Sequence, residues 1–334
     1  MDGLLVVDKP AGPTSHDVVS RLRRALREKR IGHTGTLDPM ATGVLLLVIG
    51  KATRLAKFLS ACDKSYDAIV RFGFATDTAD AQGRPLAARS QLATPSRAAI
   101  DAALEAFRGS FMQQPPAFSA KKIDGQRSYK LARAARLPPS RHLLAAADLP
   151  PLSASPASPV LPVPARVTAH SIEVVVVDAD TATLRVHCSA GFYIRSLAHD
   201  LGERLGVGAH LAALRRTRIG EFGVERAVPL DEVERDPRAA VAAMVPLADM
   251  LPGVAAVTLT AEGVERALHG RDLGPGDVLG QVSAPTALST DPAQSFSGLA
   301  GQPLIKLLDI TGALVAIAEP TSTGGLLHPR VVLV

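Results

Sequence analysis

The sequence predicts an α+β fold, because segments with strand periodicity and segments with helix periodicity occur along the same chain. In residues 66–75 apolar side chains alternate with polar ones, the pattern of a strand with one buried face. Thr14 and Asp17 have the spacing of a capping box in front of a helix with one apolar face. After residue 251 the elements are short strands and turns, which indicates a small β-rich module.

The other elements follow from the same rules. Residues 3–7 indicate a short buried strand, and residues 44–49 form an uninterrupted apolar run. We expect one helix after a cap at Thr94 and another after Gly191, ended by Gly206. Further along the chain we expect strands at 172–177, 183–188, 255–259, 303–308, 313–318 and 330–334, and a short helix at 260–269.

Composition divides the chain into two expected domains. A boundary at a Leu-Pro-Gly turn near residue 251 separates a larger domain, 1–250, from a smaller one, 251–334. Within the larger domain, residues 137–163 hold seven of the 25 prolines in the chain. Residues 282–300 are also rich in Ser, Ala and Pro. We expect both segments to be loops that add little to the packed core.

Charge and cysteine usage exclude several classes of protein. The net charge of +5 is compatible with a polyanionic partner, and the basic residues of 21–30 are either a solvated helix face or a phosphate-binding stripe. The two cysteines lie far apart, without the spacing of a disulfide framework or a zinc site. We find no signal peptide, and no apolar run approaches the roughly 18 residues of a membrane helix. We therefore expect a cytoplasmic protein that does not contact membranes.

Nucleotide-binding motifs are not matched. Gly50 and Lys51 suggest a phosphate-binding loop, but Leu45 stands where the first glycine is required and Ala52 follows the lysine. No Gly-x-Gly-x-x-Gly follows a strand, and no Gly-x-Ser-x-Gly occurs. The histidines do not have the spacing of metal ligands. We therefore expect neither a cofactor nor a metal.

The segment GHTGTLDPMATGVLLL, residues 32–47, is the most concentrated candidate site. Asp38 precedes a proline in a glycine-rich bend, which the needs of a turn alone would explain. However, the glycines permit close backbone approach, His33 lies five residues earlier, and the apolar run that follows would anchor the loop. These neighbours make Asp38 a candidate catalytic residue.

Two further candidates lie elsewhere in the chain. An ordinary solvated surface arginine is the simpler interpretation of Arg195, but this residue is at the border of the apolar face of the helix expected after Gly191. A half-buried arginine needs an anion such as Asp38. Tyr66 lies on the apolar face of the alternating strand, where a core tyrosine is the simpler interpretation. The same interpretation applies to Tyr193.

Six blocks of sequence together resemble the TruB family of bacterial tRNA pseudouridine-55 synthases. The blocks that contain GHTGTLDP and YIR are specific in combination, and all six occur in the family's order between residues 3 and 228. The resemblance implies a pseudouridine synthase fold, with a mixed, mainly antiparallel sheet, flanking helices and a C-terminal PUA-like small β-barrel. The blocks are DKPAGPTSHDVV, GHTGTLDPMATGVLLLVIGKATRLAKFL, KSYDAIVRFGFATDTADAQG, QQPPAFSAKKIDGQRSYKLAR, CSAGFYIRSLAHDLGERLG and LRRTRIGEF.

The resemblance implies an isomerase that converts uridine 55 in the T loop of tRNA to pseudouridine without a cofactor. Asp38 would be the catalytic aspartate, and three routes stay open: attack at C6 of the base, attack at the anomeric carbon, or a glycal route. Arg195 would pair with Asp38. Tyr66 would stack on the flipped base and assist proton transfer at C5.

The remaining implied roles concern the pocket and the partner. His33 would fill or brace the space that the flipped base leaves, and Tyr193 and Leu214 would line the uridine pocket. The block with Lys9 and Pro10 would support the catalytic loop. The T arm of tRNA would be the partner, and we expect a monomer.

Two residues depart from the family pattern, and one alternative function remains. Phe118 stands where the family usually has tyrosine, and Lys121 replaces a usual apolar residue. The alternative is a protein that binds or folds tRNA without chemistry. Asp38 together with Arg195 discriminates between the two, because a pure binder would tolerate Asn or Ser at position 38.

Overall fold

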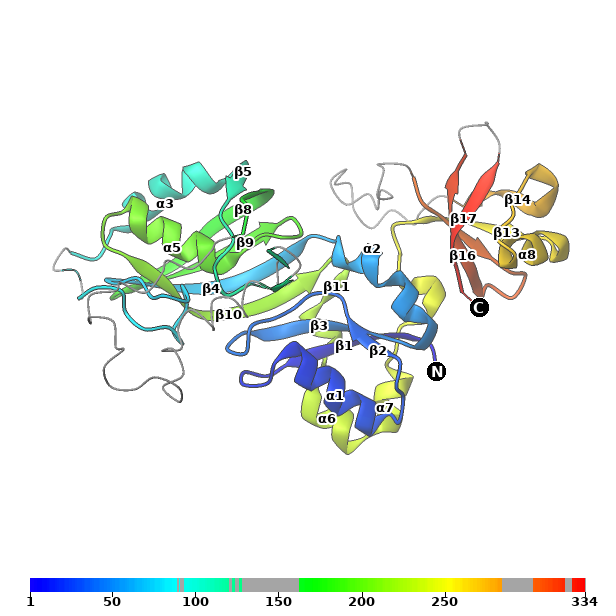
Figure 1. The fold of residues 1–334 in the computed structure, drawn as a ribbon, viewed down its shortest axis with the longest axis horizontal. Coiled ribbons are helices and arrows are strands. Elements are labelled where there is room, and N and C mark those ends of the chain that lie inside the picture. The colour runs from blue at the N-terminus through cyan, green and yellow to red at the C-terminus, as the bar shows by residue number, and fades with distance from the viewer. Residues whose placement is uncertain are drawn as a thin grey trace, which may run out of the picture. The chain divides into compact units, whose positions relative to one another are not determined.

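The structure, a computed structural model, describes residues 1–88, 90, 93–119, 122–123, 126–127, 162–283, 303–321 and 326–333 (Figure 1). It consists of two compact units: the first combines Met1–Ser65 with Arg215–Val334, and the second is Tyr66–Leu214. The loops expected at 137–163 and 282–300 lie almost entirely outside the described residues. Among the described residues, the structure has no helix with the length and apolarity needed to cross a membrane.

The first unit is built on a mixed set of strands in the order β12-β1-β3-β10. Strand β1 runs antiparallel to β3, whereas β12 is parallel to β1 and β10 is parallel to β3. The mixed sheet that the sequence predicted is therefore confirmed. The strands are β1 (Gly3–Lys9), β2 (Ile31–His33), β3 (Thr42–Ile49), β10 (Ala209–Ile219), β11 (Phe222–Gly223) and β12 (Val228–Pro229).

Helix α1 (Ser15–Ala25) begins at the predicted capping box. The Thr14 hydroxyl accepts from the amide of Asp17 at 3.1 Å, and the Asp17 carboxylate accepts from the amide of Thr14 at 2.9 Å. The apolar face of α1 is buried and packs against β2 and α6. The other helical segments of this unit before residue 250 are η1 (Gly50–Leu55), α2 (Ala56–Ser60), η4 (Val224–Arg226), α6 (Leu230–Arg235), α7 (Pro237–Ala242) and η5 (Leu247–Asp249).

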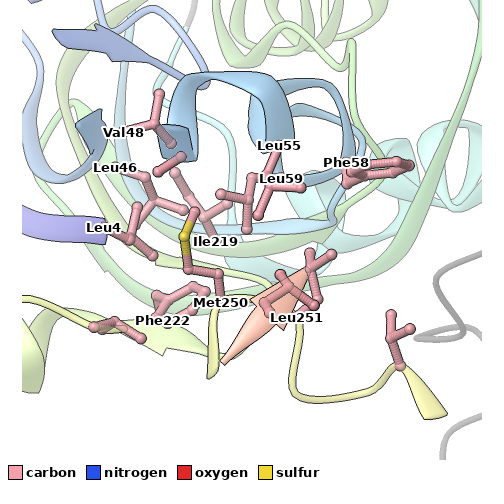
Figure 2. Packing of buried hydrophobic residues seen from close by; sticks show 14 of the residues in the cluster. Leu4, Leu46, Val48, Leu55, Phe58, Leu59, Ile219, Phe222, Met250 and Leu251 are labelled. Atoms are coloured by element: carbon pink, nitrogen blue, oxygen red, sulfur yellow. The ribbon is translucent and has the colours of Figure 1, made fainter. Parts of the chain in front are cut away.

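Strands β1 and β3 are buried on both faces, which explains the uninterrupted apolar run in β3. Leu5 and Leu47 face the core cluster that includes the apolar face of α1. Leu4 and Leu46 face the opposite cluster, which includes residues of α2 together with Leu314 and Ile317 from the C-terminal part of the chain (Figure 2). In a strand that is covered on both faces, no side chain points to solvent, so apolar residues are favoured at every position. The loop that precedes β3 is therefore attached to a rigid strand.

The C-terminal part of the first unit contains a second, smaller mixed sheet in the order β14-β13-β15-β16-β17. Its β13–β15 pairing is parallel and its other pairings are antiparallel. The predicted strands and the helix are confirmed, although the last strand begins earlier than expected. The elements are β13 (Ala255–Leu259), α8 (Ala261–Leu268), η6 (Pro275–Asp277), β14 (Val278–Ser283), β15 (Ile305–Leu308), β16 (Leu314–Pro320) and β17 (Leu327–Val332).

The second unit contains strands in the order β10-β4-β9-β8-β5. The predicted alternation in β4 is confirmed, because Tyr66, Ala68 and Val70 are buried. Helix α3 begins two residues later than predicted, since Ser96 rather than Thr94 caps it by accepting from Ala99 N. The elements are β4 (Lys64–Phe72), α3 (Arg97–Leu104), η2 (Glu105–Phe107), β5 (Gly109–Gln113), β6 (Lys122–Ile123), β7 (Gln126–Arg127), β8 (Ala165–Asp178), β9 (Thr181–Cys188) and α5 (Ile194–Arg204).

Candidate active site

Asp38 lies in the first unit, in the loop that joins β2 to β3, and its side chain is half-buried. The preceding residue, Leu37, is buried and bonded to the first residue of α1. The amide of Leu37 donates to Ser15 Oγ at 2.8 Å, and Ser15 Oγ donates to the Leu37 carbonyl at 3.2 Å. The start of α1 therefore fixes the backbone directly before Asp38, a contact that the sequence analysis missed.

Lys9, at the end of β1, fixes the backbone directly after Asp38. Its side chain is fully buried, and Nζ donates to the carbonyl oxygens of Pro10, Pro39 and Ala41 at 2.9, 3.3 and 2.6 Å. Burial lowers the pKa of Lys9 to about 8, while the negative charge of Asp38 acts in the opposite direction. The ammonium group thus holds the loop and lies within the electrostatic influence of its carboxylate.

Arg216, from β10, contacts the same loop and was also missed. It is 1% exposed, and its guanidinium donates to carbonyl oxygens on both arms of the loop. Gly43 makes this approach possible: its φ is +99°, and a Cβ there would lie 2.2 Å from the Arg216 carbonyl oxygen. A residue with a side chain would be strained and would also clash at this position.

His33 is the last residue of β2 and lies opposite Leu47 of β3. It is half-buried, and the Asp38 loop begins at the next residue. The structure therefore places both predicted site residues of the first unit on one short segment, with β3 as its support.

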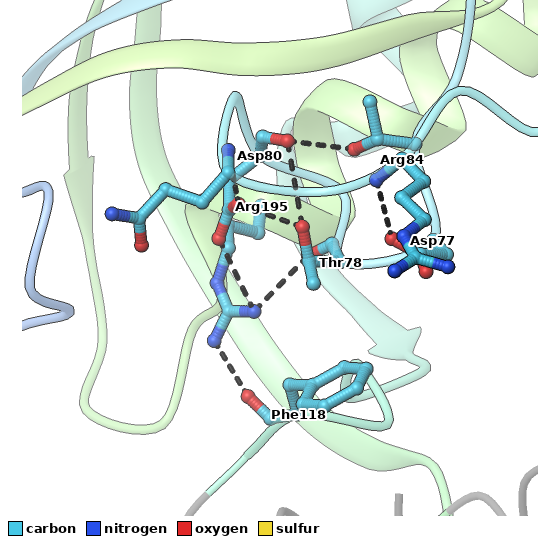
Figure 3. A network of polar contacts seen from close by, with 8 residues as sticks. Asp77, Thr78, Asp80, Arg84, Phe118 and Arg195 are labelled. Atoms are coloured by element: carbon cyan, nitrogen blue, oxygen red, sulfur yellow. Dashed lines mark hydrogen bonds and ion pairs between the residues drawn. The ribbon is translucent and has the colours of Figure 1, made fainter. Parts of the chain in front are cut away.

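Arg195 lies in the second unit, near the start of α5, and is 6% exposed. Its Nη1 donates to the carbonyl of Thr78 at 3.1 Å, and its Nη2 donates to the carbonyl of Phe118 at 2.7 Å. Its Nη1 also lies 3.7 Å from a carboxylate oxygen of Asp80 (Figure 3). Asp80 therefore supplies, within the same unit, the anion that a buried arginine needs. Asp38 belongs to the other unit, so its pairing with Arg195 stays a prediction.

Asp80 is buried and hydrogen-bonded, as is Arg195, which it faces. It is 5% exposed, and its Oδ1 accepts from Thr78 Oγ1 at 2.7 Å and from Gln82 N at 3.0 Å (Figure 3). These contacts form a tight loop whose backbone also pairs with Leu211 of β10. In the sequence this aspartate is one of several in a Thr- and Asp-rich turn, where such side chains commonly bond to nearby backbone. Because this pattern is common in turns, the sequence alone does not predict that Asp80 contacts Arg195.

Tyr193 occupies the N-cap position of α5, and a buried glutamine fixes its backbone. Gln113, at the end of β5 and 2% exposed, donates from Nε2 to the Tyr193 carbonyl at 3.0 Å. Its Oε1 accepts from the Tyr193 amide at 2.8 Å. The carboxamide thus makes the two bonds that a neighbouring strand would make. Sequence reasoning missed this residue because glutamine is usually exposed.

Tyr66 and Leu214 lie on the neighbouring strands β4 and β10 of the second unit and are 7% and 8% exposed. Phe118 contributes its carbonyl oxygen to Arg195, so this contact does not depend on the hydroxyl that the family's tyrosine would supply. Lys121 lies outside the described residues.

The chemistry available to these groups is that of a positioned carboxylate and a positioned guanidinium. Burial raises the pKa of the Cys62 thiol to about 12, so at neutral pH this thiol is not ionised and is a poor nucleophile. Asp38 is an acceptor-only group when ionised and can act as a nucleophile or a base. Its loop is held at Leu37, Pro39 and Ala41, which is the preorganisation that such a role requires.

Comparisons with known proteins agree with the resemblance in the sequence. Residues 23–141 match the model of the TruB family pseudouridylate synthase N-terminal domain, and residues 195–251 match that of the tRNA pseudouridylate synthase B C-terminal domain. The chain is 39% identical to a tRNA pseudouridine synthase B from Solibacter usitatus, with 100% of both chains covered. It is 42% identical to the enzyme of the same name from Thermobifida fusca, over 91% of this chain and 98% of that one.

A solved structure supports the fold. It is that of an H/ACA ribonucleoprotein bound to a substrate RNA containing 2′-deoxyuridine, with a TM-score of 0.66, 23% identity, and coverage of 99% of this chain and 85% of that chain. At this level of identity the likeness concerns the fold alone. Together with the full-length sequence relatives, it leads to one conclusion. The chain belongs to the TruB family of pseudouridylate synthases, which are isomerases.

Proposed function

We propose that the protein isomerises uridine 55 in the T loop of tRNA to pseudouridine, with Asp38 as the catalytic residue. The observation that carries the proposal is the fixed Asp38 loop, whose backbone is bonded to the buried side chains of Ser15 and Lys9. Buried polar side chains thus hold the backbone on both sides of one carboxylate, which is the support that a catalytic role requires. The full-length relatives named tRNA pseudouridine synthase B support the choice of substrate.

The mechanism uses the carboxylate of Asp38 on the nucleoside of a flipped uridine. The N1 glycosidic bond breaks, the base turns, and a new bond forms from the anomeric carbon to C5. C5 then loses its proton and N1 takes one up. The atoms of substrate and product are the same, so the reaction needs no oxidant or reductant. A carboxylate held in one orientation lowers the entropic part of the barrier for whichever route it takes.

The second unit supplies the other proposed groups. Arg195, which Asp80 and two carbonyl oxygens orient, pairs with Asp38 when the site is assembled. Tyr66 stacks on the flipped base, and Tyr193 and Leu214 line the uridine pocket. Tyr66 and Leu214 lie on the neighbouring strands β4 and β10, and an aromatic and an apolar side chain are of the kinds that surround a flipped base. His33, in the first unit, braces the space that the base leaves.

Further parts of the proposal concern organisation and partners. The catalytic domain is 1–250, and 251–334 forms a PUA-like small β-barrel that binds RNA; the family match that ends at residue 251 supports this boundary. The partner is the T arm of tRNA, the protein acts as a monomer in the cytoplasm, and it requires neither cofactor nor metal.

The test is a direct assay with purified protein and an unmodified tRNA transcript, without ATP, metal or cofactor. We expect carbodiimide labelling and primer extension to give one new stop, at uridine 55. Tight tRNA binding by the wild type without any new stop would contradict the proposal and indicate a tRNA-binding protein.

The Asp38→Asn variant tests the residue itself. Asparagine is nearly isosteric with aspartate but a very poor nucleophile, so tRNA affinity should stay within about twofold of wild type, while product formation falls at least about a thousandfold. Asp231→Asn is the matched control, because Asp231 is exposed and pairs only across one turn of α6 with Arg235 in the contacts seen here. Full turnover by Asp38→Asn would exclude the assigned role.

A further inference from the structure

We propose that Arg216 is a positioning residue for catalysis, which holds the two arms of the Asp38 loop together so that the carboxylate is presented in one orientation. This inference rests on the proposed function of Asp38. It assigns a role to a side chain that lies beneath the loop, on a different strand, and that acts through the loop backbone.

The contacts of the guanidinium bridge the loop. Its Nη2 and Nη1 donate to the carbonyl oxygens of Gly35 and Thr36 at 3.1 and 3.4 Å, on the arm that leads to Asp38. Its Nε donates to the carbonyl oxygen of Val44 at 2.8 Å, on the arm that leads away. One planar group therefore sets the separation of the two arms, with Asp38 between them.

The guanidinium is itself fixed. Arg216 pairs with Gly43 in the parallel ladder between β10 and β3, and the missing side chain of Gly43 lets the two backbones meet closely. Among the fully buried side chains of the described residues, that of Arg216 has the largest residue volume. Because its position is determined by the sheet, it transmits the rigidity of the sheet to the loop.

The charge of Arg216 is not explained by core packing. A buried guanidinium is costly to desolvate, and apolar side chains of similar volume often replace buried ions without loss of stability. The planar fork of arginine, however, holds several donors on different nitrogens in fixed directions, whereas the donors of a lysine share one rotating nitrogen and an apolar side chain has none. The carbonyl oxygens of the loop therefore explain why an arginine is favoured at this position.

Its neighbours on β10 have ordinary surroundings and provide the contrast. Arg215 is half-exposed and pairs with Asp8 at 2.7 Å. Arg218 is 47% exposed and lies 3.5 Å from Glu225. Of these three arginines, Arg216 alone is buried and directed at the loop. Arg218 on the same strand is therefore the matched control.

The experiment compares Arg216→Met, Arg216→Lys and the control Arg218→Met with the wild type, all as full-length protein. For each, we would measure kcat for pseudouridine formation at saturating tRNA, Kd for tRNA, and thermal unfolding. We expect Arg216→Met to lower kcat at least about a hundredfold, since a displacement near 1 Å at the reacting group has effects of this size. Its Kd should stay within about twofold, Arg216→Lys should regain part of kcat, and Arg218→Met should match the wild type.

A merely structural role would give a different pattern. If kcat and tRNA binding declined together, in proportion to the fraction of protein that is unfolded, or if Arg216→Met kept the wild-type kcat, the inference would be overturned. Should Arg216→Met not fold, the lysine variant decides: a lower kcat with unchanged Kd supports the inference, and the wild-type kcat overturns it. A wild type that makes no pseudouridine would refute the proposed function and this inference with it.

Discussion

The two halves of the proposed site hold their charged groups in opposite ways. In the first unit, cations on rigid strands, Lys9 and Arg216, bond to the carbonyl oxygens of a loop that carries the carboxylate Asp38. In the second unit, the carboxylate of Asp80 and two backbone carbonyl oxygens, those of Thr78 and Phe118, hold a cation, Arg195, on a helix. The Asp38 loop is therefore held in place by cations, whereas the Asp80 loop helps to hold a cation in place.

This difference determines what each half is sensitive to. The hydrogen-bond partners of Lys9 Nζ and of the Arg216 guanidinium are dipoles, which compensate a buried charge only partly. Burial therefore lowers the pKa of Lys9, although the negative charge of Asp38 acts against this shift. Arg195 has a full negative charge nearby as well as two carbonyl oxygens. The first half should therefore respond to protonation, and the second half to the loss of one carboxylate.

The largest effect in the second half should follow from Asp80→Asn, which keeps the shape of the side chain and removes its charge. Breaking a buried ion pair by removing one partner commonly costs about 3–5 kcal/mol, and the separation of 3.7 Å favours the lower end. We expect Tm to fall by about 6–12 °C, and product formation to fall at least about tenfold because the guanidinium of Arg195 loses one of its restraints. Differential scanning calorimetry and the primer-extension assay would measure the two effects.

The matched control is Asp77→Asn in the same loop. Asp77 accepts from the amide of Arg84 at 2.8 Å, an exposed contact that an asparagine oxygen can also make. If Asp80→Asn changed Tm and activity no more than Asp77→Asn does, the ion pair between Asp80 and Arg195 would not be what holds Arg195 in place.

An intermediate effect should appear in the first half as a pH dependence. The pKa of Lys9 is lowered from 10.5 to about 8 in the folded protein, so between these two values the unfolded chain binds a proton that the folded chain has lost. The stability contribution of Lys9 therefore rises with pH through this window, by at most about 3 kcal/mol. Activity should change in the opposite direction, since a neutral amine has two donors for three carbonyl oxygens and no charge to attract them.

Lys9→Met is the reference for this effect because methionine does not titrate. We expect the difference in Tm between wild type and Lys9→Met to shift in favour of the wild type from pH 7 to 9.5. Over the same range, kcat of the wild type should fall about threefold or more, whereas the low kcat of the variant should stay flat. A stability difference that is constant with pH would mean that Lys9 does not titrate in this range.

Much of the fold could be predicted because its signals are local. The capping box at Thr14 and Asp17 and the alternation in β4 each follow from residues that are close in sequence. The start of α3 was wrong by two residues because Thr94 and Ser96 are both good caps, and the sequence gives little to choose between them.

The predicted site residues were identified by their motifs, but their supports were not. Ser15, Asp80, Gln113 and Arg216 contact partners that lie between 2 and 181 positions away in the chain, and most of these partners are backbone atoms. A backbone carbonyl oxygen has no signature in the sequence. Buried polar side chains that serve such acceptors therefore become visible only when the strands and loops are placed in space.

The smallest effect should come from Thr14→Ala, and it measures how far the Asp38 loop depends on the start of α1. The substitution removes the hydroxyl that accepts from Asp17 N, at a typical cost of about 1 kcal/mol, or about 2–4 °C in Tm. Ser15 is the next residue, and its hydroxyl is bonded to Leu37 beside Asp38. If strand-borne Lys9 and Arg216 dominate the hold on the loop, kcat should stay within about twofold of wild type despite the lower Tm. A loss of kcat well beyond that, with the protein still folded, would mean that the helix start contributes as much to the position of Asp38 as the two buried cations do.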